Sequence, residues 1–330
     1  MKDKNIFLQT IRGICIIFVI LIHCRYIGNK GQNWHSYSLV LRQFINFPVA
    51  VFIFLSGYFT DINKEYNITV CIRRLKRLII PYLIWTIIYT GINQFISGEY
   101  SAVQLIKNIV LGTASGQLYF ILVMTQLTLL VPLIQYVYNK NGGVLLTITP
   151  AYYIMMYVLI ILGHEIPFRT TLFPAWFIYF IIGIYVRNNN ITSLIKHKYI
   201  AIVIGLLLSV IEGIIIDKYL NNYSFASSQI KISSCIYSIA IINLITNINS
   251  KCKLHRENIV SRIGNNSYGI FYSHMIFLTL CTIVLNKLCI VNNLLPIYQL
   301  IQMITSLFLS YIFVKVIKKL LGTKSYLIGD

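Results

Sequence analysis

The sequence predicts an all-α fold, a polytopic bundle of about ten transmembrane helices with both termini in the cytoplasm. Hydrophobic residues make up 57% of the 330-residue chain and charged residues only 11%, whereas a soluble domain carries about 25% charged residues. The mean hydropathy is +0.72. Many apolar stretches reach the roughly 20 residues that a spanning helix needs, and they lack the alternation of barrel strands.

The N-terminal half contains five of the expected spans. Segment 11–29 follows the polar stretch MKDKNIFLQT and lacks the small-residue cleavage site of a signal peptide. Segment 39–60 lies between two polar loops, and segment 78–97 begins after the basic cluster RRLKR. The turn sequence NKNGG separates segments 117–138 and 144–163.

The C-terminal half contains the other five. Segment 172–187 is short and ends at the polar run RNNN. The polar stretch DKYLNNYS separates segments 199–217 and 230–248. Segment 267–287 follows the turn IGNN and carries a histidine, and segment 295–317 ends in the basic sequence KVIKK.

Positive charge predicts the orientation of these segments. With both termini inside, 20 of the 28 Lys and Arg residues fall in cytoplasmic segments and the other eight in outer ones. This asymmetry is what the positive-inside rule describes. The net charge of +19 is therefore mostly a topology signal that attracts anionic membrane lipid, and no nucleic-acid partner is expected.

No linker rich in Pro, Gly or Ser interrupts the chain. We therefore expect a single integral membrane domain over residues 1–330, with no soluble appendage. The seven cysteines are scattered and form no C-x-x-C pair, so neither disulfides nor a metal site is expected. The sequence leaves the oligomeric state open, a homo-oligomer included.

Arg12 and His23 stand at the two ends of the otherwise apolar run RGICIIFVILIH. Their spacing of eleven residues places both on one helix face, about 16 Å apart along the axis. A cation at the cytoplasmic mouth and a titratable base at depth suit a long ligand with an anionic head and a reactive tail. A topological arginine and a histidine hydrogen-bonded within the bundle would explain the same pattern.

Three further ionisable groups, Arg42, Glu212 and His274, lie inside predicted spans, where charge is costly and usually faces a cavity or a partner. Glu212 is the only acid deep in a span, and His23, His274 or an arginine could neutralise it. The alternative is a structural ion pair. His274 follows Tyr268 in the sequence IGNNSYGIFYSHMIF, and a histidine satisfied in the core is the alternative there.

Two motifs lie near the predicted cytoplasmic ends of spans. Ser56 belongs to FIFLSGYF, where a small-residue helix contact is the simpler interpretation and a nucleophile would need an adjacent base. Arg74 and Arg77, in IRRLKRLIIPYLIW, are three residues apart. Their guanidinium groups could bind phosphates bidentately, and lipid headgroups are the alternative ligand. Pro81 is expected near the start of the next helix.

These motifs resemble, in their order and over nearly the whole chain, those of the acyltransferase 3 family of bacterial integral membrane acyltransferases. The family's R-x10-H pattern is matched by Arg12 and His23, its R-x-x-R pattern by Arg74 and Arg77, and its FLSGY signature by the same letters here. LYFILVMTQLTLLVPLI, WFIYFIIGIYVR and IGNNSYGIFYSH resemble three further family segments. One departure is Gln117, because relatives with the LYF variant often have a histidine there.

The resemblance implies transfer of an acyl group, usually acetyl, from cytoplasmic acyl-CoA to a hydroxyl of a cell-envelope polysaccharide or its lipid-linked precursor. It implies a multi-pass protein of the bacterial cytoplasmic (inner) membrane, with acetyl-CoA as donor and no metal. His23 could be a general base or a transient acyl carrier. The implied catalytic residues are His23, Glu212 and His274, those for acyl-CoA are Arg12, Ser56, Tyr58, Arg74 and Arg77, and those for the acceptor are Tyr119, Trp176 and Tyr268.

Two other functions are compatible with the same scaffold. A proton-coupled transporter or exporter of a small molecule or glycan would use Glu212 and the two histidines, but it has no need of a site for CoA phosphates. A membrane-embedded scaffold for a glycan synthase would be insensitive to single polar substitutions inside spans.

Overall fold

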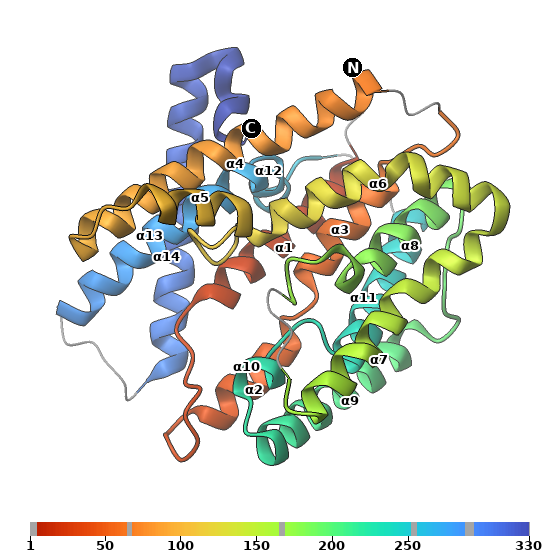
Figure 1. Ribbon diagram of the computed structural model, residues 1–330, viewed down its shortest axis with the longest axis horizontal. Coiled ribbons are helices and arrows are strands. Elements are labelled where there is room, and N and C mark those ends of the chain that lie inside the picture. Colours follow the sequence, from red (N-terminus) through yellow and green to blue (C-terminus); the bar gives the residue numbers. More distant parts are fainter. Residues whose placement is uncertain (1–4, 65–67, 165–168, 252–255, 288–293, 330) are drawn as a thin grey trace. The chain divides into compact units, whose positions relative to one another are not determined.

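The computed structural model describes residues 5–64, 68–164, 169–251, 256–287 and 294–329. These residues form helices joined by short connections, and no strand occurs among them (Figure 1). Eight stretches of the described chain are long and apolar enough to cross a membrane. The protein is therefore a multi-pass, all-α membrane protein, as the sequence predicts. Its orientation in the membrane stays a prediction.

All ten predicted spans fall on helices, but not on ten equally long ones. The fourth and fifth lie in one apolar stretch, in which α6 (Tyr119–Asn141) and α7 (Ile148–Ile161) are joined by the 3-10 helix η1 (Gly142–Thr147). The sixth corresponds to α8 (Phe177–Asn188), which has 12 residues. At 1.5 Å per residue, α8 is shorter than the hydrocarbon core of about 30 Å.

The chain forms two compact units, and each is assembled from two separate parts of the sequence. The first unit comprises the chain up to Phe52 together with Asn189–Val314, and the second comprises Ile53–Asn188 together with the chain from Lys315. Helices α3 (Pro48–Tyr58) and α14 (Leu295–Leu321) run across these boundaries. The single domain expected from the uniform composition stays a prediction.

The first unit is built around α1 and around the pair α9 and α11, which lie side by side (Figure 1). Close packing of α1 against α12 requires glycine, because a Cβ at Gly13 would overlap the carbonyl oxygen of Val260 and one at Gly264 would overlap that of Gln9. Besides most of α14, the helices of this unit are α1 (Ile6–His23), α2 (His35–Phe44), α9 (Lys198–Leu220), α10 (Tyr223–Ala226), α11 (Ile232–Lys251), α12 (Ile259–Asn265) and α13 (Ser267–Lys287).

The second unit contains the end of α3 and the helices from α4 to α8. Helices α3 and α8 approach closely, because a Cβ at Gly57 would overlap the carbonyl oxygen of Phe180 and one at Gly183 would overlap that of Phe54. Besides α6, η1, α7 and α8, the elements of this unit are α4 (Ile68–Ser97), α5 (Ala102–Leu111), η2 (Phe173–Ala175), the end of α14 and η3 (Gly322–Ile328).

Two helix boundaries differ from the prediction. The expected span 39–60 is two helices, α2 and α3, and Pro48 begins the second one, where its missing N–H costs little. Helix α4 begins at Ile68, so Pro81 lies inside it and not near its start. The prediction was wrong there because the basic residues 73–77 were assigned to a loop, whereas they occupy the first turns of the helix.

Candidate functional site

Arg12 and His23 lie on one uninterrupted helix, as their spacing predicts. Helix α1 runs from Ile6 to His23 with no break, so the two side chains share a face and are separated by about 16 Å along the axis. Both side chains are partly exposed. His23 is the last residue of the helix, so its position depends on how that end is fixed.

The C-terminal end of α1 is held by two side chains that donate to its last carbonyl groups. Tyr26 donates its hydroxyl to the carbonyl oxygen of Leu21 (2.9 Å), and Arg42 donates Nη1 to that of Ile22 (2.8 Å). The guanidinium of Arg42 also lies over the Tyr26 ring. These contacts fix the backbone next to His23.

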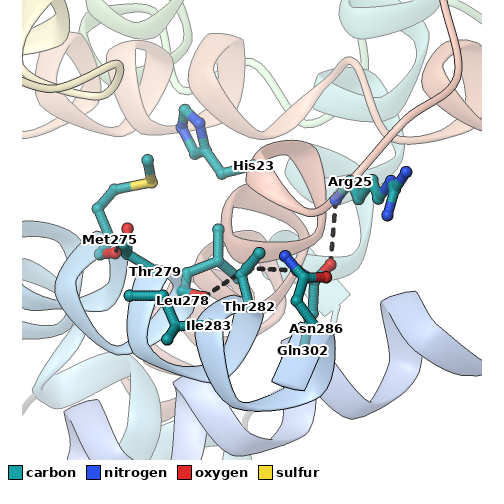
Figure 2. A pocket seen from close by; sticks show the side chains of 9 residues that line it. All are labelled: His23, Arg25, Met275, Leu278, Thr279, Thr282, Ile283, Asn286 and Gln302. Atoms are coloured by element: carbon teal, nitrogen blue, oxygen red, sulfur yellow. Dashed lines mark hydrogen bonds between the residues drawn. The ribbon is translucent and has the colours of Figure 1, made fainter. Parts of the chain in front are cut away.

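His23 lines a pocket of about 510 Å³ within the first unit (Figure 2). In Figure 2, the imidazole of His23 lies toward one end of the lining, while Asn286 and Gln302 lie toward the other. Gln302 connects the segment after α1 to α13, because it accepts a hydrogen bond from the backbone N–H of Arg25 (3.0 Å) and donates one to the hydroxyl of Thr282 (2.8 Å). The complete lining combines polar and apolar side chains and is His23, Arg25, Met275, Leu278, Thr279, Thr282, Ile283, Asn286 and Gln302.

His274 lies on α13 and is fully buried, with its ring centroid 5.4 Å from that of His23. Its Nδ1 is hydrogen-bonded to the carbonyl oxygens of Phe271 (2.7 Å) and Ile270 (3.2 Å). Ser306 of α14 donates to the backbone carbonyl oxygen of His274 (2.8 Å). The structure therefore brings together two of the three predicted catalytic residues, although 251 positions separate them in the sequence.

Tyr268 begins an aromatic strip along α13. Its ring stacks on Phe271 with the planes 10° apart, and its hydroxyl lies 3.3 Å from that of Tyr272. The ring centroids of Phe271 and His274 are 6.3 Å apart. Tyr268 thus lies on the helix that carries His274, two turns closer to its start.

Glu212, the third predicted catalytic residue, lies on α9 against the first turn of α11. Its carboxylate accepts hydrogen bonds from the backbone N–H of Ser233, at 3.0 Å, and from the Ser233 hydroxyl. It also attracts the ammonium group of Lys231. Glu212 therefore has a helix-capping role in the structure, in addition to any role in chemistry.

Lys231 is a fully buried cation that the sequence analysis did not single out. Its Nζ donates to Oε1 of Gln43 (2.7 Å) and to the carbonyl oxygen of Ser209 (3.4 Å). The Ser209 hydroxyl donates to the same Gln43 oxygen (2.9 Å). The sequence did contain a signal, because Lys231 is the second residue of the expected span 230–248.

A largely buried hydrogen-bonded pair was also missed. His35, the first residue of α2, and Asp217, near the end of α9, are joined by a hydrogen bond with Nε2 and Oδ2 3.0 Å apart, and each side chain is 11% exposed. No spacing in the sequence links these two residues, so only the fold could show this contact. The pair ties α2 to α9 within the first unit.

On the second unit, Arg74 is joined to the FLSGY motif. Its Nη1 donates to the hydroxyl of Thr60 (3.1 Å), and that hydroxyl donates to the carbonyl oxygen of Ser56 (2.9 Å). Arg77, one turn further along α4, is exposed. Arg74 thus anchors the basic start of α4 through a hydrogen bond, whereas the side chain of Arg77 is exposed.

Tyr58 lies beneath a cation that the sequence analysis quoted only as the end of a motif. The guanidinium of Arg187, the penultimate residue of α8, lies 5.7 Å from the centroid of the Tyr58 ring. The glycine contact between α3 and α8 makes this approach possible. Gly57 therefore supports the interpretation of this motif as a small-residue helix contact.

Two of the three aromatic residues expected on the acceptor side lie together in the second unit. Tyr119 and Trp176 stack with ring centroids 6.2 Å apart, and Trp176 donates Nε1 to the carbonyl oxygen of Thr170 (2.8 Å). Trp176 is only 1% exposed, so it acts here as a core residue. Gln117, at the position of the family histidine, is buried and accepts from the hydroxyl of Ser115 (2.6 Å).

The predicted site residues fall into two groups, one on each unit. The first unit holds Arg12, His23, Glu212, Tyr268 and His274, and the second holds Ser56, Tyr58, Arg74, Arg77, Tyr119 and Trp176. No group of three or more His, Cys, Asp or Glu side chains within the described residues is arranged to hold a metal ion.

Comparison with known proteins identifies the family. Residues 5–315 match the family model of the acyltransferase 3 domain, described as an acyltransferase domain. Two relatives from Staphylococcus aureus strains MSSA476 and MRSA252 are each 26% identical over 301 residues, covering 84% of this chain and 83% of theirs. Both are described as a probable poly-beta-1,6-N-acetyl-D-glucosamine export protein. No solved structure shows a significant match. The chain belongs to the acyltransferase 3 family.

Proposed function

We propose that this protein transfers an acetyl group from cytoplasmic acetyl-CoA to a hydroxyl of a cell-envelope polysaccharide or its lipid-linked precursor, in the bacterial cytoplasmic membrane. The observation that carries the proposal is His23, which lines a pocket and lies beside a second histidine. Family membership supports acyl transfer. The description of the relatives, which names an N-acetylglucosamine polymer, supports a polysaccharide acceptor.

The predicted topology supports arrival of the acceptor from the outer side. If the N-terminus is cytoplasmic, α1 ends with His23 toward the outer face, and the pocket residues from Leu278 to Asn286 follow the midpoint of an outward-running α13. Gln302 lies near the start of α14, which returns from outside. With this topology, the lining residues on α1, α13 and α14 all fall in the outer half of the first unit.

The chemistry assigned to His23 is general base catalysis. Its unprotonated nitrogen takes the proton of the acceptor hydroxyl while the hydroxyl oxygen attacks the thioester carbon. The C–O bond forms, the C–S bond breaks, and the CoA thiolate leaves and recovers the proton. A general base of this kind contributes about 10²–10⁴-fold to the rate.

The donor is assigned to the basic start of α4. The exposed guanidinium of Arg77 and the anchored one of Arg74 are suited to the phosphates of CoA, because guanidinium groups bind phosphate oxygens in pairs. Ser56 and Tyr58 are included in the proposed donor site. The carbonyl group of Ser56 is linked to Arg74 through the hydroxyl of Thr60, and the ring of Tyr58 lies under the guanidinium of Arg187.

Acetyl-CoA binding to the detergent-purified protein tests this assignment. We expect saturable binding and a raised thermal midpoint, because a ligand that binds only the folded state stabilises it. Arg74→Ala/Arg77→Ala should lose both effects. Arg256→Ala/Arg262→Ala is the matched control, since both of these arginines are also exposed. Absence of binding to a folded wild type at millimolar acetyl-CoA would contradict the proposed donor.

Export of a glycan is a second candidate function. The description of the relatives favours it, and so does the attraction between the buried Lys231 and the half-buried Glu212, because ionisable groups inside a membrane domain often couple transport to ions. Export without dependence on acetyl-CoA, together with wild-type export by Arg74→Ala/Arg77→Ala, would favour this candidate over acyl transfer.

A further inference from the structure

We propose that His274 is a positioning residue for His23, and that its Nε2 accepts a hydrogen bond from an N–H of the His23 imidazole during acyl transfer. The proposal rests on the acyl transfer proposed above and adds a role for a residue that cannot reach the acceptor, because His274 is fully buried and does not line the pocket.

The contacts of His274 define which of its nitrogens carries the proton. Nδ1 faces two backbone carbonyl oxygens, those of Phe271 and Ile270. Carbonyl oxygens only accept, so Nδ1 must be the donor. In a neutral imidazole the other nitrogen, Nε2, then has a lone pair and no proton. His274 is thereby prepared as a hydrogen-bond acceptor.

That lone pair has no hydrogen-bond partner within the described part of the chain. Nε2 of His274 is buried and unpaired there, which is unfavourable, because a buried acceptor without a donor has lost its water and gained nothing. A donor that reaches Nε2 during the reaction would remove this penalty.

The imidazole of His23 is the group placed to supply that donor. The two ring centroids are 5.4 Å apart and the planes are tilted by 45°. Two imidazoles joined by an N–H···N hydrogen bond of about 3 Å have centroids roughly 5 Å apart. Rotation of the His23 side chain therefore suffices, while Arg42 holds the carbonyl group of the preceding residue, Ile22, and Ser306 holds that of His274.

The hydrogen bond would decide which nitrogen of His23 is the base. A neutral His23 carries one proton on its ring. If the N–H points to His274, the lone pair is on the other nitrogen, which is then available on the side of the pocket. The acceptor proton moves to that nitrogen and later to the CoA thiolate, and the proton shared with His274 stays on His23 throughout.

Nitrogen NMR of the ¹⁵N-histidine-labelled full-length protein tests the contact without any activity assay. The chain has six histidines, and the variants His23→Gln and His274→Gln assign the two resonance pairs. We expect His274 protonated at Nδ1 alone, and a single tautomer of His23 that becomes a mixture in His274→Leu. A proton on Nε2 of His274, or a His23 signal unaffected by His274→Leu, would overturn the proposal.

Acyl-transfer kinetics provide the second test. We expect His274→Leu to lower kcat by about tenfold or more, part of the effect of a general base, with an unchanged KM for acetyl-CoA. His274→Gln should retain more activity than His274→Leu, since its amide can still donate and accept. In a His23→Gln background, His274→Leu should cause no further loss, because a positioning residue acts only through the group it positions.

The control variant is Ser273→Ala. Ser273 is also fully buried on α13, and its hydroxyl donates to the carbonyl oxygen of Gly269. We expect it to retain wild-type kcat. Losses that add up in the His23→Gln/His274→Leu double variant would show a purely structural role and overturn the proposal. If His23→Gln alone leaves transfer intact, the proposed function fails, while the NMR result still decides the contact.

Discussion

Lys231 is fully buried beside Gln43 and Ser209, and its charge is offset by the attraction of Glu212. Gln43 links this lysine to the surrounding backbone, because its amide nitrogen also donates to the carbonyl oxygens of Leu39 (3.0 Å) and Ala226 (3.1 Å). Buried polar networks of this kind are costly when one member is removed, because the remaining groups stay desolvated.

Lys231→Met tests this dependence. Methionine keeps the volume but leaves Gln43 and Glu212 without the ammonium group, so we expect a loss of about 1–3 kcal/mol in the free energy of unfolding, measured as a lower thermal midpoint in detergent. In this background, Glu212→Gln should be less destabilising than in the wild type, because it removes the uncompensated charge. Equal effects of Glu212→Gln in both backgrounds would show that the two charges are independent.

The predictable part of the candidate site is what lies on one helix. The shared face of Arg12 and His23 follows from their spacing of eleven residues, and α1 confirms it. The contact of His23 with His274, and that of His35 with Asp217, join residues remote in the sequence. Only tertiary packing could show such contacts, so a single sequence could name the residues but not pair them.

At the level of elements, glycines decide which helices approach closely. The FLSGY motif and the FIIG segment belong to the same contact, in which Gly57 and Gly183 lie against backbone carbonyl groups of the partner helix. Small residues let helix backbones approach where no larger side chain fits. This contact also places Arg187 over Tyr58, so packing and the candidate site depend on the same residues.

Gly57→Ala should therefore destabilise the protein by about 1–3 kcal/mol, since the new methyl group would overlap the carbonyl oxygen of Phe180 and the helices would have to separate. Gly91→Ala is the matched control on α4, because a Cβ there meets nothing within 4 Å. We expect it to cause no destabilisation, because alanine has a helix propensity about 1 kcal/mol more favourable than that of glycine. Thermal midpoints of both variants in one detergent check the prediction, which equal midpoints would contradict.

Helix type was predictable from the sequence, whereas helix boundaries were less so. Long apolar runs predict spanning helices such as α9 and α11 correctly, because continuous hydrophobicity of that length has few other solutions in a membrane. The start of α4 was missed because its first turns are rich in arginine and lysine. The break between α2 and α3 was missed because the apolar pattern continues across it, although Pro48 marks the point.

At the level of the whole molecule, the division into two units left no trace in the composition. Each unit combines two separate parts of the chain, and apolar spans with similar composition make up both. The order of motifs along the sequence still identified the family, and the family match over residues 5–315 extends across both units. Chain order therefore carried the functional information, while the grouping of the helices came from their packing.

Transfer of radiolabelled acetyl from acetyl-CoA to envelope polysaccharide, in membranes containing the full-length protein, tests the central claim most directly. We expect label in the polysaccharide fraction with the wild type, and a loss of about 10²–10⁴-fold with His23→Gln, the range for removal of a general base. The Ser273→Ala variant should transfer as the wild type does. Equal transfer by wild type and His23→Gln, at equal amounts of folded protein, would contradict the account.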